Sequence, residues 1–148
     1  MPMNEPFHEE RFQVRYQETD QMGVVHHSQY AVWFEVGRIG LIDRLGLSYG
    51  ELEKKGMLLP VVDLRCRYVA SARFGDEVGI RTQVDEIRGP KLTFAYEVVR
   101  VGDKQRLSHG KTIHLWVDGN MKPFDFERKQ PDIARCLRRF ARSSEKGE

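Results

Sequence analysis

The chain has 148 residues, of which 40% are apolar and 31% are charged, and its net charge is +2. This length and composition suit one globular domain over residues 1–148 and exclude a chain that is disordered throughout. So weak a net charge does not favour a nucleic-acid binder, and no apolar run approaches the roughly 20 residues of a membrane-spanning helix.

The first predicted elements are a strand and a loop. Apolar and polar side chains alternate over about residues 11–16, which is typical of a half-buried strand. Asp20 and Gly23 then break this alternation, so a loop is expected over residues 19–27, called the entry loop below.

A long helix is expected next, over about residues 28–45. Its apolar residues recur three and four positions apart, and Gly46 is placed to end it. Gly37 and Gly40 lie inside this helix, where each costs about 1 kcal/mol relative to alanine. They predict that a covering sheet packs closely against the helix backbone.

A short second helix has capping signals at both ends. Ser48 and Glu51 match the S-x-x-E capping box. Leu47 and Leu52 have the spacing of a hydrophobic staple, and Gly56 suits a left-handed C-terminal cap.

Alternating patterns after Pro60 predict four longer strands, around residues 62–68, 78–84, 92–98 and 113–117. Hairpin-like turns between them imply an antiparallel sheet. Pro131 suits a first helical turn, so a C-terminal helical extension is expected over about residues 131–142. The fold class expected is α+β, with about five strands wrapped around one long helix in a core of about residues 11–118.

Residues that carry chemistry are concentrated in the entry loop. Asp20, His26 and His27 lie there, directly before the long helix. Free backbone N–H groups at a helix start can hold a developing oxyanion, while an adjacent carboxylate acts as base or nucleophile. Gly23 lets the loop backbone approach a substrate closely. The alternative is that Asp20 only closes an Asx turn and that both histidines are solvated.

A spaced set of residues runs through the entry loop and the helix: Tyr16, Asp20, Gly23, Val25, His27, Tyr30, Trp33, Phe34, Glu35 and Arg38. This set resembles the signature of acyl-CoA thioesterases of the 4-hydroxybenzoyl-CoA thioesterase type. Within that family it is most similar to the bacterial branch associated with the Tol-Pal gene cluster. The similarity extends from about residue 12 to residue 117.

The resemblance implies a hotdog fold, in which an antiparallel sheet wraps around a long helix. It implies that Asp20 is the catalytic carboxylate and that His27 is a second catalytic residue. The substrate-binding residues expected beside them are Gly23, Val25, His26, Ser28 and Tyr30. The family often has tyrosine where this chain has His26.

The resemblance also implies a homodimer or homotetramer with the site at the dimer interface. A physical argument agrees, because a curled single sheet would leave its outer face and its edge strand exposed. Pairing of two edges about a two-fold axis would bury them.

Glu35 is a second candidate acid or base, since some hotdog thioesterases use a glutamate on the helix. The favoured alternative is an ion pair between Glu35 and Arg38, which are three residues apart on the helix.

Arg88 and Lys91 flank the turn Gly89-Pro90 and are candidates to bind the phosphates of coenzyme A. The alternative is that they are ordinary exposed side chains. Weaker candidates of the same kind are Arg65, Arg67 and Arg73. The basic C-terminal residues are expected on the solvated face of a helix: Arg135, Arg138, Arg139 and Arg142.

Together these features predict a cytoplasmic enzyme that hydrolyses an acyl-CoA thioester to free acid and coenzyme A. Asp20 would be nucleophile or general base, and backbone amides near His27 and Ser28 would polarise the carbonyl. Coenzyme A is part of the substrate, so no cofactor is expected, and the sequence has no HExxH or CxxC motif for a metal. An acyl carrier protein is an alternative carrier of the acyl group.

Two rivals stay open from sequence: a non-catalytic acyl-CoA or acyl-carrier-protein binding module, and a hotdog dehydratase or hydratase. The acyl group is also open. Its slot, flat and aromatic or short and aliphatic, is expected to be lined by Trp33, Phe34, Val62 and Tyr68.

Overall fold

The computed structural model describes residues 3–142; residues 1–2 and 143–148, the ends of the domain expected over 1–148, lie outside the described residues. Five strands form one antiparallel sheet in the order β1-β3-β4-β5-β2. They are β1 His8–Gln13, β2 Val61–Tyr68, β3 Glu77–Arg88, β4 Lys91–Arg100 and β5 Arg106–Leu115. The helices are α1 Ser28–Arg44, α2 Tyr49–Lys54, α3 Phe126–Lys129 and α4 Pro131–Leu137, with 3-10 turns at Tyr16–Glu18 and Arg138–Phe140.

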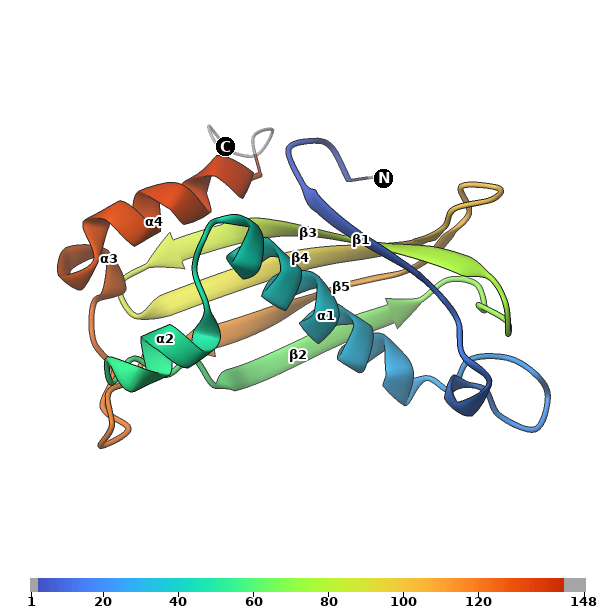
Figure 1. The fold of residues 1–148 in the computed structure, drawn as a ribbon, viewed down its shortest axis with the longest axis horizontal. Coiled ribbons are helices and arrows are strands. Elements are labelled where there is room, and N and C mark those ends of the chain that lie inside the picture. The colour runs from blue at the N-terminus through green and yellow to red at the C-terminus, as the bar shows by residue number, and fades with distance from the viewer. Residues whose placement is uncertain (1–2, 143–148) are drawn as a thin grey trace.

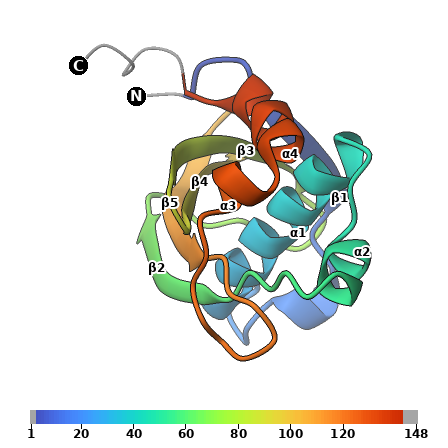
Figure 2. The same cartoon turned by 90° about the vertical axis from the view of Figure 1, so that its left-hand side faces the viewer.

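The sheet curls around α1, which runs along it (Figure 1). Viewed from the end, the strands curve around α1 from β1 to β2, while α3 and α4 cover one end of the sheet (Figure 2). Phe34 and Leu41 of α1 are fully buried against this sheet. The α+β hotdog architecture expected from the sequence is therefore confirmed, and α1 ends within one residue of its predicted limit.

Two glycines of α1 lie where the helix touches the sheet. A Cβ atom at Gly37 would lie 2.8 Å from Cγ2 of Ile80 in β3. One at Gly40 would overlap the side chain of Glu10 in β1. The close approach that these glycines predicted is confirmed.

The first strand lies earlier in the chain than its alternation predicted. β1 spans His8–Gln13, not residues 11–16, and Tyr16 lies exposed in a 3-10 turn. After β1 ends, the Glu18 carboxylate accepts a hydrogen bond from the Arg15 N–H at 2.8 Å. This cap turns the chain out of the sheet, and alternation alone carries no sign of it.

The buried side of β5 is its polar side. Thr112 and His114 are fully buried, whereas Ile113 and Leu115 are only partly buried. The Tyr96 hydroxyl lies 2.6 Å from Thr112 Oγ1, which lies 2.8 Å from His114 Nε2. Because these hydrogen bonds satisfy the polar atoms, the strand can bury them at little cost.

The outer face of the central strands is covered within the chain, contrary to the expectation of a bare face. Glu97 in β4 is only 2% exposed and forms ion pairs with Arg81 at 3.4 Å and Arg106 at 3.2 Å. Beside it, the Gln83 amide donates to the Pro6 carbonyl at 2.9 Å. Long charged side chains and the N-terminal segment thus shield this face.

The edge strand β2 is exposed, as expected. Within residues 3–142 it pairs only with β5. Val62, Leu64 and Tyr68 are 54%, 44% and 52% exposed, respectively. The exposed apolar surface of the sheet therefore lies at this edge.

Candidate active site

The entry loop lies at one end of the molecule, and backbone hydrogen bonds hold its C-terminal part, just before α1. The Val25 N–H donates to the Ala72 carbonyl at 2.9 Å, and the His26 N–H donates to the Glu18 carbonyl at 3.0 Å. Gly23 has a φ of +81°, a conformation that favours glycine. The loop therefore comes back to its own starting point just before α1 begins.

The Asp20 side chain is anchored by its own loop. Its Oδ1 accepts hydrogen bonds from the Met22 N–H at 2.8 Å and the Val24 N–H at 3.3 Å. The Asx turn considered as the alternative is therefore present. Within residues 3–142, the other oxygen, Oδ2, accepts no hydrogen bond, and Asp20 is only half-buried. A held carboxylate with one free oxygen suits either a nucleophile or a general base.

His26 caps the start of α1. The Ser28 N–H donates to His26 Nδ1 at 3.2 Å, and the Ser28 hydroxyl lies 2.9 Å from the same nitrogen. Because a backbone N–H only donates, His26 Nδ1 carries no proton. The His26 ring stacks on the ring of His27 with centroids 4.3 Å apart.

The amides at the start of α1 are only partly free. The Gln29 and Tyr30 N–H groups donate to the carbonyls of His26 and His27 at 3.0 and 3.3 Å. The His27 N–H has no hydrogen-bond partner within the described chain. Two amides were expected to polarise a carbonyl. Within the described chain the His27 N–H is free to donate to one, whereas the Ser28 N–H already donates to His26 Nδ1.

A pocket of about 210 Å³ opens beside the start of α1, lined by Val25, His27, Tyr30, Tyr68, Val69, Ala70 and Ser71. It therefore brings together the predicted residues Val25, His27 and Tyr30 with Tyr68 of the predicted acyl slot. The sequence did not indicate the segment 69–71, because a valine, an alanine and a serine after a strand form no distinctive pattern.

The other residues predicted for this end of the molecule do not line the pocket: Asp20, Gly23, His26 and Ser28. They belong to the loop and helix start next to it. Trp33 and Phe34 are 1% and 0% exposed, so they form core rather than a slot wall. Val62 lies toward the other end of β2.

Tyr68 connects the edge strand to the start of α1. Its hydroxyl donates to the His27 carbonyl at 3.3 Å, and its ring meets the ring of Tyr30 edge-on at 5.4 Å. The Tyr30 hydroxyl in turn accepts a hydrogen bond from the Ala72 N–H at 3.2 Å. Burial raises the pKa of Tyr30, so this phenol is a neutral part of the wall.

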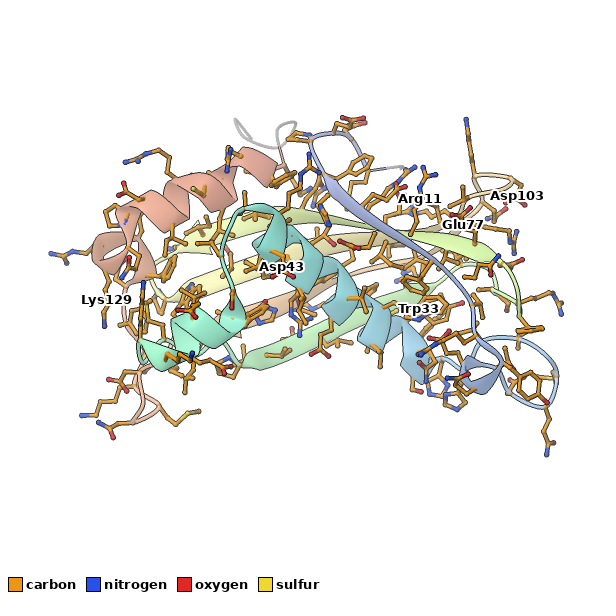
Figure 3. All side chains as sticks on the ribbon, viewed as in Figure 1. Arg11, Trp33, Asp43, Glu77, Asp103 and Lys129 are labelled. Carbon is orange, nitrogen blue, oxygen red and sulfur yellow. The ribbon has the colours of Figure 1, made fainter. Side chains whose placement is uncertain are left out.

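Glu18 is a site residue to which sequence reasoning gave no role. It is only 3% exposed and accepts hydrogen bonds from the Arg15 N–H at 2.8 Å and from Trp33 Nε1 at 3.0 Å. Burial alone would raise the pKa of Glu18, but the hydrogen bonds from Arg15 and Trp33 hold it below its ordinary value. Trp33 lies in the N-terminal part of α1 (Figure 3). Glu18 therefore ties the entry loop to α1.

The basic hairpin lies far from the entry loop in the same chain. Arg88 and Lys91 face each other at the β3–β4 turn, near α3 and α4, whereas the entry loop is at the opposite end of the sheet (Figure 1). Arg88 is exposed, and Lys91 forms an ion pair with Glu86 at 3.2 Å. One chain therefore does not bring the predicted phosphate site and the predicted catalytic residues together.

The predicted ion pair between Glu35 and Arg38 is not formed. Glu35 is exposed, while Arg38 turns inward and donates a long hydrogen bond of 3.5 Å to the Tyr96 hydroxyl. Arg38 points inward because the Tyr96 hydroxyl offers it a hydrogen-bond acceptor on the inner side of the sheet.

Other basic residues lie outside the pocket. Arg65 pairs with Asp63 at 3.1 Å, and Arg67 and Arg73 are exposed. Along the C-terminal helix, Arg135 and Arg139 are exposed as expected. Within the described residues, three of the four arginines pair with carboxylates: Arg135 with Asp132, Arg138 with Glu127 and Arg142 with Asp85.

Within the described chain, no three His, Cys, Asp or Glu side chains gather as a metal site would require. None of the helices described here combines the length and apolar character needed to cross a membrane.

Comparison with known proteins gives one family match. A family model described as the thioesterase-like superfamily matches residues 14–137. The protein YneP of Bacillus subtilis, which carries the name of an acyl-CoA thioesterase, is 38% identical over 81% of this chain and 87% of its own length.

Solved structures agree. A hypothetical protein from Thermus thermophilus superposes with a TM-score of 0.81 at 41% identity, covering 90% of this chain and 98% of that one. A DHNA-CoA thioesterase from Staphylococcus aureus superposes with a TM-score of 0.82 at 32% identity, covering 88% of this chain and 87% of that one.

Proposed function

The chain belongs to the thioesterase-like superfamily, and on that premise we propose that it hydrolyses acyl-CoA thioesters to the free carboxylic acid and coenzyme A. The observation that carries the proposal is the Asp20 carboxylate, fixed by the Met22 and Val24 amides with one oxygen left free. The relatives named as CoA thioesterases support the substrate class.

Asp20 acts in one of two ways. As a general base, its free oxygen takes a proton from water, and the water oxygen attacks the thioester carbon. As a nucleophile, the same oxygen attacks that carbon and forms a mixed anhydride, which water then cleaves. In both routes the C–S bond breaks and coenzyme A leaves as a thiolate, which takes up a proton.

The open N–H of His27 is the donor for the developing oxyanion. It lies at the N-terminus of the 17-residue helix α1, whose dipole favours negative charge there. The His27 ring forms part of the pocket wall next to the same point. This scheme uses only groups of the chain, so no cofactor takes part, and coenzyme A enters as part of the substrate.

The acyl group occupies the pocket between Tyr30 and Tyr68. Its volume of about 210 Å³ is below the roughly 300–1,000 Å³ of sites for drug-sized ligands. A short aliphatic chain or a single aromatic ring therefore fits better than a long chain.

The active protein is a dimer or tetramer, with each pocket at a boundary between chains. Tyr68 supports this, because it lines the pocket and also belongs to the exposed edge strand β2. Edge pairing of two β2 strands would bury this apolar edge. Light scattering at micromolar concentration tests this, and a protein that is only monomeric would contradict it.

The nucleotide end of coenzyme A binds Arg88 and Lys91 of a second copy. β3 has 12 residues and so spans about 40 Å, which separates the hairpin of one chain from its own entry loop.

The entry-loop sequence around Asp20 supports a finer placement in the Tol-Pal-associated branch. An acyl carrier protein is the alternative donor of the acyl group.

The experiment that tests the function is a kinetic panel of acetyl, longer aliphatic and aromatic acyl-CoA thioesters, with thiol release as the signal. Turnover of at least one thioester that is lost in Asp20→Asn is the expected result. Tight binding of acyl-CoA without turnover would identify a binding module instead. Hydration of an enoyl-CoA without thiol release would identify a hydratase.

A further inference from the structure

Two aromatic rings lie exposed at the entry-loop end of the molecule, outside the pocket. Tyr16 and Phe74 are 76% and 61% exposed. Their ring centroids lie 5.8 Å apart, and the planes of the two rings make an angle of 85°. A group of large apolar side chains that stays this exposed on a folded domain marks a binding surface.

Backbone contacts hold the two rings together before any ligand binds. The Gly75 N–H donates to the Val14 carbonyl at 3.2 Å. On the other side of the same segment, Arg73 forms a β-bridge with Val24 of the entry loop. Because the backbone around both rings is already ordered, a ligand that binds them pays little for immobilising the chain.

The ring pair lies close to the pocket of the same chain. The turn that carries Tyr16 and the connection from β2 to β3 that carries Phe74 both lie at the entry-loop end (Figure 1). Ser71 lines the pocket, and Phe74 follows it by three residues, which span at most about 11 Å. The pantetheine arm and diphosphate of coenzyme A are together longer than this. A nucleotide whose acyl group occupies the pocket can therefore reach the two rings.

An adenine base suits the geometry of this pair. Two rings at nearly a right angle form a corner, in which a planar base stacks on one ring and packs its edge against the other. Nucleobases bind exposed aromatic side chains in this way, because every base has a π face. Arg73 precedes Phe74, is exposed and forms no ion pair within residues 3–142, so a cation is available to a phosphate beside the base.

We propose that Tyr16 and Phe74 form the platform on which the adenine of coenzyme A stacks. This rests on the proposed function, which supplies an acyl-CoA as the substrate. The base is then held by the chain that holds the acyl group, while Arg88 and Lys91 of a second copy contact the phosphates. An acyl carrier protein presents the same phosphopantetheine arm without a base. The platform therefore favours coenzyme A over a carrier protein as the donor of the acyl group.

Calorimetric titration of coenzyme A into Tyr16→Ala and Phe74→Ala tests the platform without any turnover. Loss of a stacking ring should raise the Kd for coenzyme A at least about fivefold. The second probe is 4′-phosphopantetheine, which has the arm and one phosphate but no base, and it should bind the parent and both variants equally. Because stacking on a neutral ring needs no ion pair, the effect should persist at high salt, which screens exposed charges.

Tyr16→Phe and Phe74→Tyr keep a ring at each position, so both should bind coenzyme A with a near-parental Kd. Met121→Ala is the matched control, because it truncates an apolar side chain that is similarly exposed, at 62%, on another loop. It should also bind coenzyme A like the parent. Thermal melts check that each variant is folded, which is expected because every substituted side chain is exposed.

A parental Kd for coenzyme A in both alanine variants would overturn the proposal, as would an equal loss of affinity for the two probes. Weaker dimerisation in sedimentation with parental binding of coenzyme A would also overturn it, and would assign the rings to a contact between copies. The titration reports on the base whether or not a thioester is hydrolysed. Failure of the proposed function would instead appear as a parent that turns over no thioester in the kinetic panel.

Discussion

Asp20 is the residue on which the proposed chemistry depends. Asp20→Asn keeps the side-chain shape and an acceptor for the Met22 and Val24 amides, but it removes the negative charge. We therefore expect kcat on the best thioester to fall by about a thousandfold or more, with the fold unchanged. Steady-state kinetics measure this, and a loss below about tenfold would move the chemistry to Glu35 or another group.

His26 and His27 should differ in what their loss affects. His27→Ala removes part of the pocket wall beside the open amide, so we expect the larger loss of kcat/KM. His26→Ala removes the acceptor for the Ser28 N–H, so it should lower the free energy of unfolding by about 1 kcal/mol. Kinetics and urea unfolding of both variants separate these effects. The opposite order of activity loss would assign the catalytic role to His26.

Glu18 should affect activity by holding the entry loop, and with it Asp20, in position. Glu18→Gln loses the charge and at least one good acceptor for Arg15 or Trp33, which costs about 1–3 kcal/mol of stability. We also expect kcat to fall while KM stays near its parental value, because the entry loop holds Asp20 less firmly.

The control for Glu18 is Trp33→Phe, which removes the indole donor together with part of a buried ring and leaves the carboxylate with Arg15. It should show a smaller loss of kcat. A Glu18→Gln enzyme that is less stable but has a parental kcat would limit Glu18 to a structural role.

At the scale of elements, β4 and β5 bury a directional hydrogen-bond chain beneath α1. The Leu59 carbonyl only accepts, so His114 donates to it through Nδ1, at 3.3 Å, and accepts from the Thr112 hydroxyl through Nε2, at 2.8 Å. This arrangement requires a neutral imidazole. Burial and the neighbouring Arg38 lower the pKa of His114 from 6.5 to about 4.

This neutral histidine predicts a loss of stability in acid. In the unfolded chain His114 binds a proton below its ordinary pKa of 6.5. In the folded chain it binds one only below its lowered pKa of about 4. Stability is therefore full above pH 6.5 and falls as the pH drops toward 4, by roughly 3 kcal/mol in total.

Urea unfolding at pH 7.5 and pH 4.5 measures this fall for the parent and for His114→Gln. The variant should lose less stability between the two pH values, because carboxylates contribute equally to both proteins. Equal losses in the two proteins would show that His114 is not the titrating group.

The elements with local signals were those predicted well. The Ser48 side chain accepts from the Glu51 N–H at 3.2 Å, as the capping box indicated, and the glycines of α1 lie against the sheet. The end of β1 was missed because it depends on Glu18, whose partner Trp33 is 15 residues away. The polar inward face of β5 was missed for the same reason, since His114 is satisfied by Leu59, which is distant in sequence.

The candidate site was predictable to a similar degree. Asp20 and His27 are only seven residues apart in the chain and share one loop, so a local pattern could identify them. Tyr68 reaches His27 across 41 residues, and only the closure of the sheet around α1 brings them together. The expectation of a bare outer face failed because the ion pairs of Glu97 join β4 to β3 and to β5, and these cross-strand partners depend on the register of the sheet.

At the scale of the whole molecule, the two regions proposed to bind the substrate lie at opposite ends of one sheet. The entry loop and pocket are at one end, and the Arg88–Lys91 hairpin is at the other (Figure 1). A single chain therefore presents the proposed acyl pocket without the proposed phosphate site beside it. An assembly in which a second copy runs in the opposite direction would place the hairpin of one chain near the entry loop of the other.

The last prediction concerns this hairpin. If Arg88 and Lys91 contact the phosphates of coenzyme A, changing both to Ala should raise KM for an acyl-CoA several-fold and leave kcat nearly unchanged, because only binding common to ground and transition states is lost. Arg88 is exposed and Lys91 shares its charge with Glu86. The effect on KM should therefore weaken with added salt, which screens exposed charges within about 8–10 Å.

An acyl-pantetheine thioester, which lacks the nucleotide phosphates, is the control substrate. The parent and the Arg88→Ala, Lys91→Ala double variant should hydrolyse it equally. An equal loss on both substrates would show that the hairpin supports the fold or shapes the site. A mixture of this double variant with Asp20→Asn then locates the hairpin, because only a heterodimer can combine an intact Asp20 with an intact hairpin from the other chain. Recovery of low-KM turnover in the mixture is the result expected for a site shared between chains, and its absence would place the nucleotide elsewhere.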